Sequence, residues 1–385
     1  MGTFIIRRMA LMLLTALSLT FIVFVMTNLQ PNLEKLAKTQ GNFRMSEAEV
    51  SSYLRDRGFD RPVTLKYGEW LGIVPSYLIE GRDGETRSRC SAHGVIKSNT
   101  PRYCGIIQGY WGQSWVFKEP VADVIAKRLS ATGVLMFWVF LVMVPSALFL
   151  GVLAGMKEGS RLDRTLSTGA IATTATPEYV SGVVFIALLA SSKFGLSPLF
   201  NSLGWSDKRI LFKGSATSAA KEMPADYDVY WLPDFLEGFW WKVAEAPTLE
   251  NFMLPVLTIA LYGMGYIARM TRASMAEVMT SQYIRTARLK GVNFRNIVIK
   301  HALRNALIAP FTVIMLQIPW LLTGVVIVET LFNFKGLGFA LVQAAGNNDI
   351  DLLLAVSVVS VIVVLMTQLI SDIGYVFLNP RISIS

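Results

Sequence analysis

Six long apolar runs constrain what this 385-residue chain can fold into. A helix needs about 20 residues to cross the roughly 30 Å hydrocarbon core of a bilayer, and each run reaches or approaches that length. Only 16% of the residues are charged, whereas soluble domains average about 25%. The runs are Met9–Asn28, Leu129–Met156, Thr165–Ser192, Asn251–Ala268, Asn305–Val328 and Leu352–Leu378. We therefore predict an all-α polytopic membrane protein with six transmembrane helices.

The first run follows Arg7 and Arg8, a pattern that is also typical of signal peptides. The run is longer than a usual signal-peptide core, and no small-residue cleavage site follows it in residues 26–31. We predict an uncleaved anchor whose N-terminus is cytoplasmic.

Basic residues between the runs indicate the orientation of the chain. With a cytoplasmic N-terminus, the segments Met156–Arg164 and Arg269–Arg304 lie inside, and they carry three and eight Lys or Arg. Cytoplasmic segments favour such residues, which also accounts for the net charge of +9 without nucleic-acid binding. Six crossings return the C-terminus, Asn379–Ser385, to the cytoplasm.

The segment 29–128 lies outside in this topology. Its 15 basic and 11 acidic residues predict a small folded excursion. It contains both cysteines, Cys90 and Cys104, for which we expect a disulfide in an oxidising compartment. Free thiols, or a metal site that also uses His93, are the alternatives.

The second outer segment ends in the aromatic run Tyr230–Trp241. Aromatic side chains at this density are typical of the membrane interface, and a substrate-stacking surface is the alternative.

Motifs of common enzymes are missing from the sequence. It has no phosphate-binding loop of the GxxxxGK[ST] type, no GxSxG and no HExxH. We predict a chain that is not an enzyme and that binds no cofactor or metal.

Three acids lie within or beside the apolar runs. Such groups are costly in lipid and are functional candidates. Glu178 follows Pro177, which we expect to kink the third helix near its middle. This pair could line a translocation path, or Glu178 could be a hydrogen-bonded structural group. For Glu329 and Asp372 we favour a structural role.

The basic segment Arg269–Arg304 predicts a short helix, a tight turn and a second helix. Residues 282–290 contain no Gly or Pro and place Arg285 and Arg288 one turn apart. Gly291 suits the left-handed position that ends a helix, and Asn293 suits the cap that begins the next. This projection is either a docking element or a solvated basic face.

The residues Tyr283–Gly291, with His301–Ala306 and Pro310, resemble the cytoplasmic loop signature of ABC importer permeases. The resemblance is to the branch that imports dipeptides, oligopeptides, nickel or opines. The general signature begins Glu-Ala-Ala, and here Arg285-Thr286-Ala287 stands at the same spacing before Gly291. Further similar segments follow in order: Phe4–Arg8, Asp60–Val63, Tyr67–Trp70, Pro120-Val121 with Ile125–Leu129, Glu329–Phe332, Gly336–Gly338 and Ser371–Ile382.

The outer segments depart from the usual permease. Pro75–Gln108 and much of Asn201–Pro247 look like insertions, and Asn347–Asp351 replaces the usual residues after the Gly-Leu-Gly turn. These changes leave the substrate and the docking of a binding protein open.

The resemblance implies the fold and the role of a type I ABC importer permease in the bacterial inner membrane. Its domains would be residues 1–28 with the first helix, the extracytoplasmic segment 29–128 and the transmembrane core 129–385, with a coupling loop at 269–304. Its partners would be a second permease, two ATPase subunits that hold ATP and Mg²⁺, and an extracytoplasmic solute-binding protein. The ATPase-coupling residues would be Arg285, Thr286, Ala287, Arg288, Lys290, Gly291 and Asn293.

The substrate would be a peptide or a peptide-like solute. A secondary transporter that uses Glu178 or Asp372 as a proton relay is the alternative, although the sequence shows no convincing internal repeat.

Overall fold

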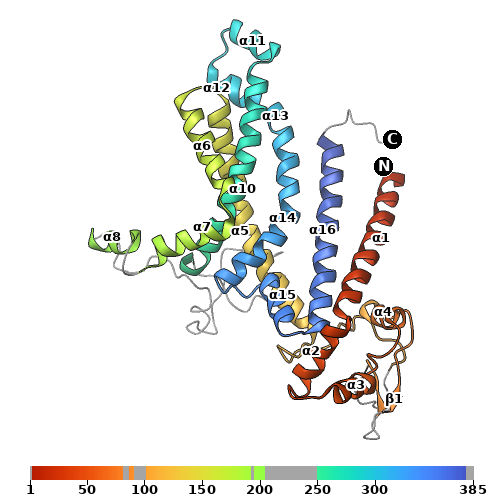
Figure 1. Ribbon diagram of the computed structural model, residues 1–385. Coiled ribbons are helices and arrows are strands. Elements are labelled where there is room, and N and C mark those ends of the chain that lie inside the picture. Colours follow the sequence, from red (N-terminus) through yellow and green to blue (C-terminus); the bar gives the residue numbers. More distant parts are fainter. Residues whose placement is uncertain (1, 81–85, 91–100, 192–194, 204–248, 379–385) are drawn as a thin grey trace, which may run out of the picture. The chain divides into compact units, whose positions relative to one another are not determined.

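The computed structural model describes residues 2–80, 86–90, 101–191, 195–203 and 249–378 (Figure 1). The aromatic run Tyr230–Trp241 lies outside these residues, as does His93. The chain forms two compact units. Unit 1 comprises Met1–Leu129 and Ala340–Ile362, and unit 2 comprises Ser130–Phe339 and Val363–Ser385. The first boundary falls one residue after the predicted end of the outer segment at Arg128, but the inclusion of residues 340–362 in unit 1 was not predicted.

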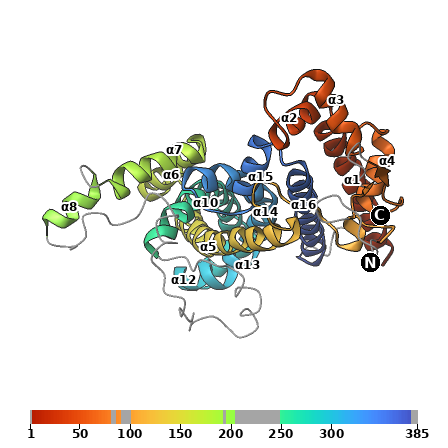
Figure 2. The same ribbon diagram turned by 90° about the horizontal axis from the view of Figure 1, so that it is seen from below.

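Unit 1 consists of short helices gathered at one end of a long helix (Figure 1), and these short helices also lie together in the view from below (Figure 2). Its elements are α1 (Gly2–Thr27), α2 (Gln30–Gln40), α3 (Glu47–Asp56), α4 (Val63–Leu71), the strands β1 (Ile79–Glu80) and β2 (Thr86–Arg87), and the 3-10 helix η2 (Ile106–Gln108). The two strands pair antiparallel, with Ile79 opposite Arg87. Apart from this hairpin and one isolated bridge, the regular structure of the described residues is helical, which confirms the all-α prediction.

Aromatic side chains join α1 to α4 in unit 1. The rings of Phe24 and Trp70 lie 5.5 Å apart, and Tyr67 stacks on Trp70 at 5.7 Å. The Tyr67 hydroxyl also lies 2.8 Å from Thr20 Oγ1. Because Phe24 and Trp70 are buried with leucines of α2 and α3, they form the core of this unit.

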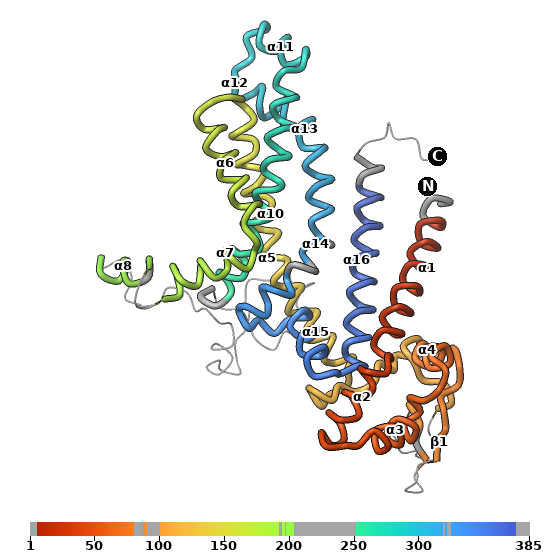
Figure 3. Tube along the Cα trace, viewed as in Figure 1, coloured from red at the N-terminus to blue at the C-terminus, as the bar shows by residue number. Residues whose placement is uncertain are grey.

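Unit 2 is built around α10 (Leu249–Met279), which packs against α6, α7 and α14 (Figure 3). The other elements of this unit are α5 (Val121–Gly155, which begins in unit 1), α6 (Arg161–Ala175), α7 (Glu178–Phe185), the π-helical turn η3 (Ile186–Ala190), α8 (Leu196–Ser202), α11 (Gln282–Leu289), α12 (Phe294–Asn296), the π-helical turn η5 (Ile297–Ala302), α13 (Leu303–Ala306) and α14 (Ile308–Leu331). Two further helices, α15 (Leu337–Gly346) and α16 (Ile350–Leu378), have residues in both units.

Four helices of the described chain are long and apolar enough to cross a membrane. They contain the segments Ile6–Thr27, Val121–Gly155, Phe252–Met279 and Ile350–Gly374. Two bent helix pairs raise the number to six if each pair is one span. Little of the first of these segments is buried within the chain, so its apolar side chains are available to lipid.

The third predicted run bends at Pro177 as expected, but the bend is a break between two helices and not a kink within one. It is divided into α6 and the α7–η3 segment, which meet at 102°. The residue before a proline is pushed toward extended backbone, and Thr176 has φ −92° and ψ 122°. Glu178 therefore lies in the first turn of α7 and not in the middle of a helix.

We predict that Trp70→Ala lowers the free energy of unfolding by about 3–5 kcal/mol, because a large buried ring leaves a cavity. Thermal unfolding of the detergent-solubilised chain, followed by circular dichroism, measures this effect. Phe43→Ala is the control, since 78% of the Phe43 side chain is exposed. Equal melting temperatures for the two variants would contradict the role of Trp70.

Candidate functional site

The candidate site is the projection formed by α11, its turn and α12. It lies at the end of α10 in unit 2 (Figure 1). Thr280 and Ser281 separate α10 from α11, and their hydroxyl groups donate to the carbonyls of Glu277 and Val278. These bonds end α10, and α11 begins directly afterwards.

One face of α11 is buried. Ile284 and Ala287 pack against Met275 and Met279 of α10 and against Ile297 of η5. A hydrogen bond of 2.8 Å from Ser274 Oγ to the Ala306 carbonyl also joins α10 to α13. Ala287 was predicted among the coupling residues, but its side chain is buried in the contact between α11 and α10 and is not exposed to a partner.

The turn after α11 is a Schellman motif. Gly291 has φ 73°, which confirms the predicted left-handed conformation. The Gly291 N–H donates to the Arg288 carbonyl at 3.0 Å, and the Val292 N–H donates to the Ala287 carbonyl at 3.2 Å. The predicted cap at Asn293 is also confirmed, because its Oδ1 accepts from the Arg295 N–H at 3.3 Å.

The outer face of α11 is polar and cationic. Arg285, Thr286, Arg288 and Lys290 are all exposed. Within the described part of the chain, none of the three cations among them forms an ion pair with a carboxylate. The three positive charges are therefore available to a binding partner.

Leu289 is the exception on this face, because 82% of its side chain is exposed. Sequence reasoning missed this residue. The sequence signal for its exposure was that Leu289 lies between Arg288 and Lys290 and does not share the helix face of Ile284 and Ala287.

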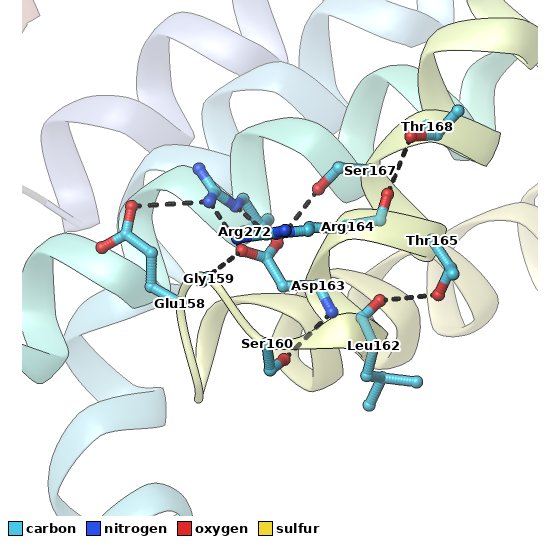
Figure 4. A network of polar contacts seen from close by, with 10 residues as sticks. All are labelled: Glu158, Gly159, Ser160, Leu162, Asp163, Arg164, Thr165, Ser167, Thr168 and Arg272. Carbon is cyan, nitrogen blue, oxygen red and sulfur yellow. Dashed lines mark hydrogen bonds and ion pairs between the residues drawn. The ribbon is translucent and has the colours of Figure 1, made fainter.

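An ion pair anchors the neighbouring α5–α6 turn to α10 (Figure 4). Arg272 donates from Nε to Asp163 Oδ1 at 2.9 Å and from Nη2 to Asp163 Oδ2 at 2.8 Å. Asp163 also accepts from Ser167 Oγ at 3.0 Å and from the Gly159 N–H at 2.9 Å. This buried carboxylate therefore joins the α5–α6 turn and the start of α6 to α10.

A second contact joins the same turn to α12. The ammonium group of Lys157 lies 5.5 Å from the centre of the Phe294 ring. This cation–π contact brings the α5–α6 turn next to the projection.

The remaining predicted residues lie elsewhere. Pro177 caps α7, and Glu178 follows it, where the helix dipole favours a carboxylate. Cys90 and Cys104 form a disulfide with a Cα–Cα distance of 5.6 Å. Among the residues that the structure describes, no group of three His, Cys, Asp or Glu side chains could hold a metal ion.

Glu329 is fully buried in unit 2 and holds the start of α15. It accepts from Thr132 Oγ1 at 2.5 Å and from the Phe339 N–H at 2.9 Å. The Leu337 N–H donates to the same Thr132 oxygen at 2.8 Å. These contacts fit the structural role that we favoured for Glu329.

We predict that Asp163→Asn lowers the free energy of unfolding by about 2 kcal/mol, because hydrogen bonds to a charged group are lost. Glu158→Gln is the matched control, since Glu158 Oε1 lies 3.4 Å from Arg272 Nη2 and its side chain is mostly exposed. An exposed pair of this kind contributes about 0–1 kcal/mol. Thermal unfolding in detergent compares the two variants, and an equal loss would contradict the central role of Asp163.

Comparison of the sequence with known proteins identifies the family of this chain. Residues 147–384 match the family described as "Binding-protein-dependent transport system inner membrane component". The chain is 25% identical to the oligopeptide transport system permease protein AppB of Bacillus subtilis, over 99% of both chains. It is 27% identical to the di/tripeptide transport system permease protein DppB of Pseudomonas aeruginosa, over 99% of both, and 26% identical to the dipeptide transport system permease protein DppB of Escherichia coli, over 98% of both. These matches support a permease over a secondary transporter. Since the family match covers more than half of its length, the chain belongs to the binding-protein-dependent inner membrane components, the permease subunits of type I ABC importers.

Proposed function

We propose that this permease imports peptides or peptide-like solutes and that its α11 projection receives the movement of an ATPase. Relatives that match nearly the whole chain are named for oligopeptide, di/tripeptide and dipeptide transport, which supports the solute class. The outer insertions leave room for a solute that differs from those of the relatives.

The proposed complex contains a second homologous permease, two cytoplasmic ATPase subunits that bind ATP and Mg²⁺, and an extracytoplasmic solute-binding protein. We place it in a bacterial inner membrane with both termini of this chain in the cytoplasm. The eight Lys and Arg of Arg269–Arg304 support this orientation, because short cytoplasmic segments favour basic residues.

Co-purification tests this composition. The detergent-extracted permease should carry an ATPase pair, and a solute-binding protein loaded with peptide should stimulate ATP hydrolysis. Extraction of the permease without an ATPase under conditions that keep it folded would contradict the proposal.

The observation that carries the coupling role is the division of α11 into two faces. Arg285, Arg288 and Leu289 are exposed, whereas Ile284 and Ala287 are packed onto α10. A partner that grips the outer face can therefore move α10 through the inner face. Coupling of this kind requires that the partner contacts α11 differently in its two states.

We also propose that Pro177 and Glu178 line the translocation path. The extended backbone at Thr176 interrupts the helix between α6 and α7, although the Thr176 N–H still donates to the Ala172 carbonyl and the Pro177 carbonyl accepts from the Val180 N–H. Non-helical backbone at membrane depth is tolerated where it lines a water-filled cavity or is buried in protein, which favours a position facing the path.

We predict that Arg288→Glu and Gly291→Pro each abolish ATP-driven uptake while the complex still assembles in the membrane. The first reverses a charge on the docking face. The second imposes a φ near −65° where the chain needs 73°, and it removes the N–H that bonds the Arg288 carbonyl. Uptake of labelled peptide by vesicles and ATP hydrolysis are measured together.

Lys300→Glu is the control for charge, because Lys300 is exposed in the same basic segment but lies in η5. Its uptake should remain close to that of the unaltered protein. If Lys300→Glu and Arg288→Glu reduce uptake equally, the overall charge and not α11 would be the cause.

We also predict that Leu289→Ser weakens binding of the ATPase pair by roughly tenfold, because an exposed leucine contributes about 1.5–3 kcal/mol when a partner buries it fully. The melting temperature of the isolated permease should not change. Unchanged affinity for the ATPase pair, measured by titration in detergent, would exclude Leu289 from the interface.

A further inference from the structure

A polar cavity of about 350 Å³ lies within unit 1. Its walls come from the end of α1, from α2, from the α3–α4 connection and α4, and from the first turn of α16. In both Figure 1 and Figure 2 the short helices α2, α3 and α4 gather at one end of α1. This volume lies within the range of small-molecule sites.

Three of the charged groups that line the cavity already have close partners within the protein. Arg61 forms a two-pronged ion pair with Glu69, in which Nη2 lies 2.6 Å from Oε2. Asp349 accepts from Ser114 Oγ at 2.6 Å and from the N–H groups of Val116 and Leu352 at 3.2 Å. These three charged groups are not available to a ligand.

Lys66 is a buried cation whose hydrogen bonds go to uncharged groups. It is 7% exposed, and its Nζ donates to Asn28 Oδ1 at 3.1 Å and to the Phe59 carbonyl at 2.9 Å. Burial lowers the pKa of Lys66, and the positive charge of Arg61 lowers it further. A negative charge inside the cavity would relieve both effects.

Arg89 also has unused hydrogen-bonding capacity. Its Nε and Nη2 are buried and have no hydrogen-bond partner among the residues that the structure describes. Its ion pair with Asp351 is loose, with 3.5 Å between Nη2 and Oδ1. Arg89 precedes Cys90, so the disulfide to Cys104 holds this stretch of chain beside the cavity.

Arg89 and Asp351 line the same cavity as Tyr77 and Tyr110, and Arg89 Nη2 lies 3.5 Å from Asp351 Oδ1. Burial raises the pKa of Tyr77, and the charges of Arg89 and Asp351 both act on its hydroxyl. The same two charges act on Tyr110, which also lines the cavity. Arg89 and Asp351 therefore face one common space.

We propose that this cavity binds a small zwitterion of the amino-acid or dipeptide type, with its carboxylate on Arg89 and its ammonium group on Asp351. Arginine presents parallel N–H groups that match a carboxylate, and both unused N–H groups of Arg89 are buried beside the cavity. Lys66 adds positive potential to the same cavity. The cavity has more available positive than negative charge, which favours a ligand that brings a carboxylate. This inference goes beyond the transport role, since it needs neither the ATPase subunits nor the translocation path.

Ligand pairs on the unaltered protein test the proposal directly. The full chain in lipid nanodiscs is titrated by calorimetry with alanyl-alanine, with its C-terminal amide and with its N-acetyl derivative. We expect one saturable site for alanyl-alanine and at least tenfold weaker binding of both derivatives. Absence of saturable binding, or equal binding of alanyl-alanine and its amide, would overturn the proposal.

Variants then assign the site within the chain. Arg89→Gln should weaken alanyl-alanine binding at least tenfold. Arg57→Gln is the matched control, because Arg57 lines the same cavity but its guanidinium carbon lies 3.7 Å from the centre of the Tyr53 ring. Its affinity should change less than twofold. Binding by Arg89→Gln at the original affinity would place the site elsewhere and overturn the assignment.

Discussion

Unit 2 depends on the close approach of α5 to α10. A Cβ atom added at Gly151 would lie 2.5 Å from Thr271 Cβ, and one added at Gly155 would lie 2.6 Å from the Arg272 carbonyl oxygen. Helices in membranes associate through such small-residue contacts, because lipid provides no hydrophobic force between them. The Asp163–Arg272 ion pair lies at the same end of this contact and fixes the turn that follows α5.

The α11 projection continues from this contact. Met275 and Met279 belong to the last turns of α10, and together with Val152 and Met156 they contact the cluster that supports α11. A displacement of α11 is therefore transmitted to side chains at the ends of both α5 and α10. Because packed side chains cannot be compressed, such a displacement moves whole helices.

Local sequence was sufficient to predict the parts of the site that depend on the backbone. Gly291 was expected to end a helix and Asn293 to begin one, because each requirement concerns only a few neighbouring residues. At Pro177 the same reasoning predicted the place of the bend but not its size. It predicted a kink, but the extended backbone at Thr176 separates two helices that meet at 102°. The size of such a bend depends on the neighbouring helices, which the local sequence does not describe.

By itself, the sequence determined the apolar segments and the family signature around Gly291, and it predicted an orientation in the membrane. Only the tertiary structure decided that Asp163 pairs with Arg272 across 109 positions, that Ala287 is buried and that Leu289 is exposed. It also decided that Lys66, Arg89 and Asp351 line one cavity. The physical reason is the range of the interactions involved. Hydrophobic length, turn conformation and helix caps act over a few residues of the chain, whereas ion pairs and burial depend on which distant segments pack together.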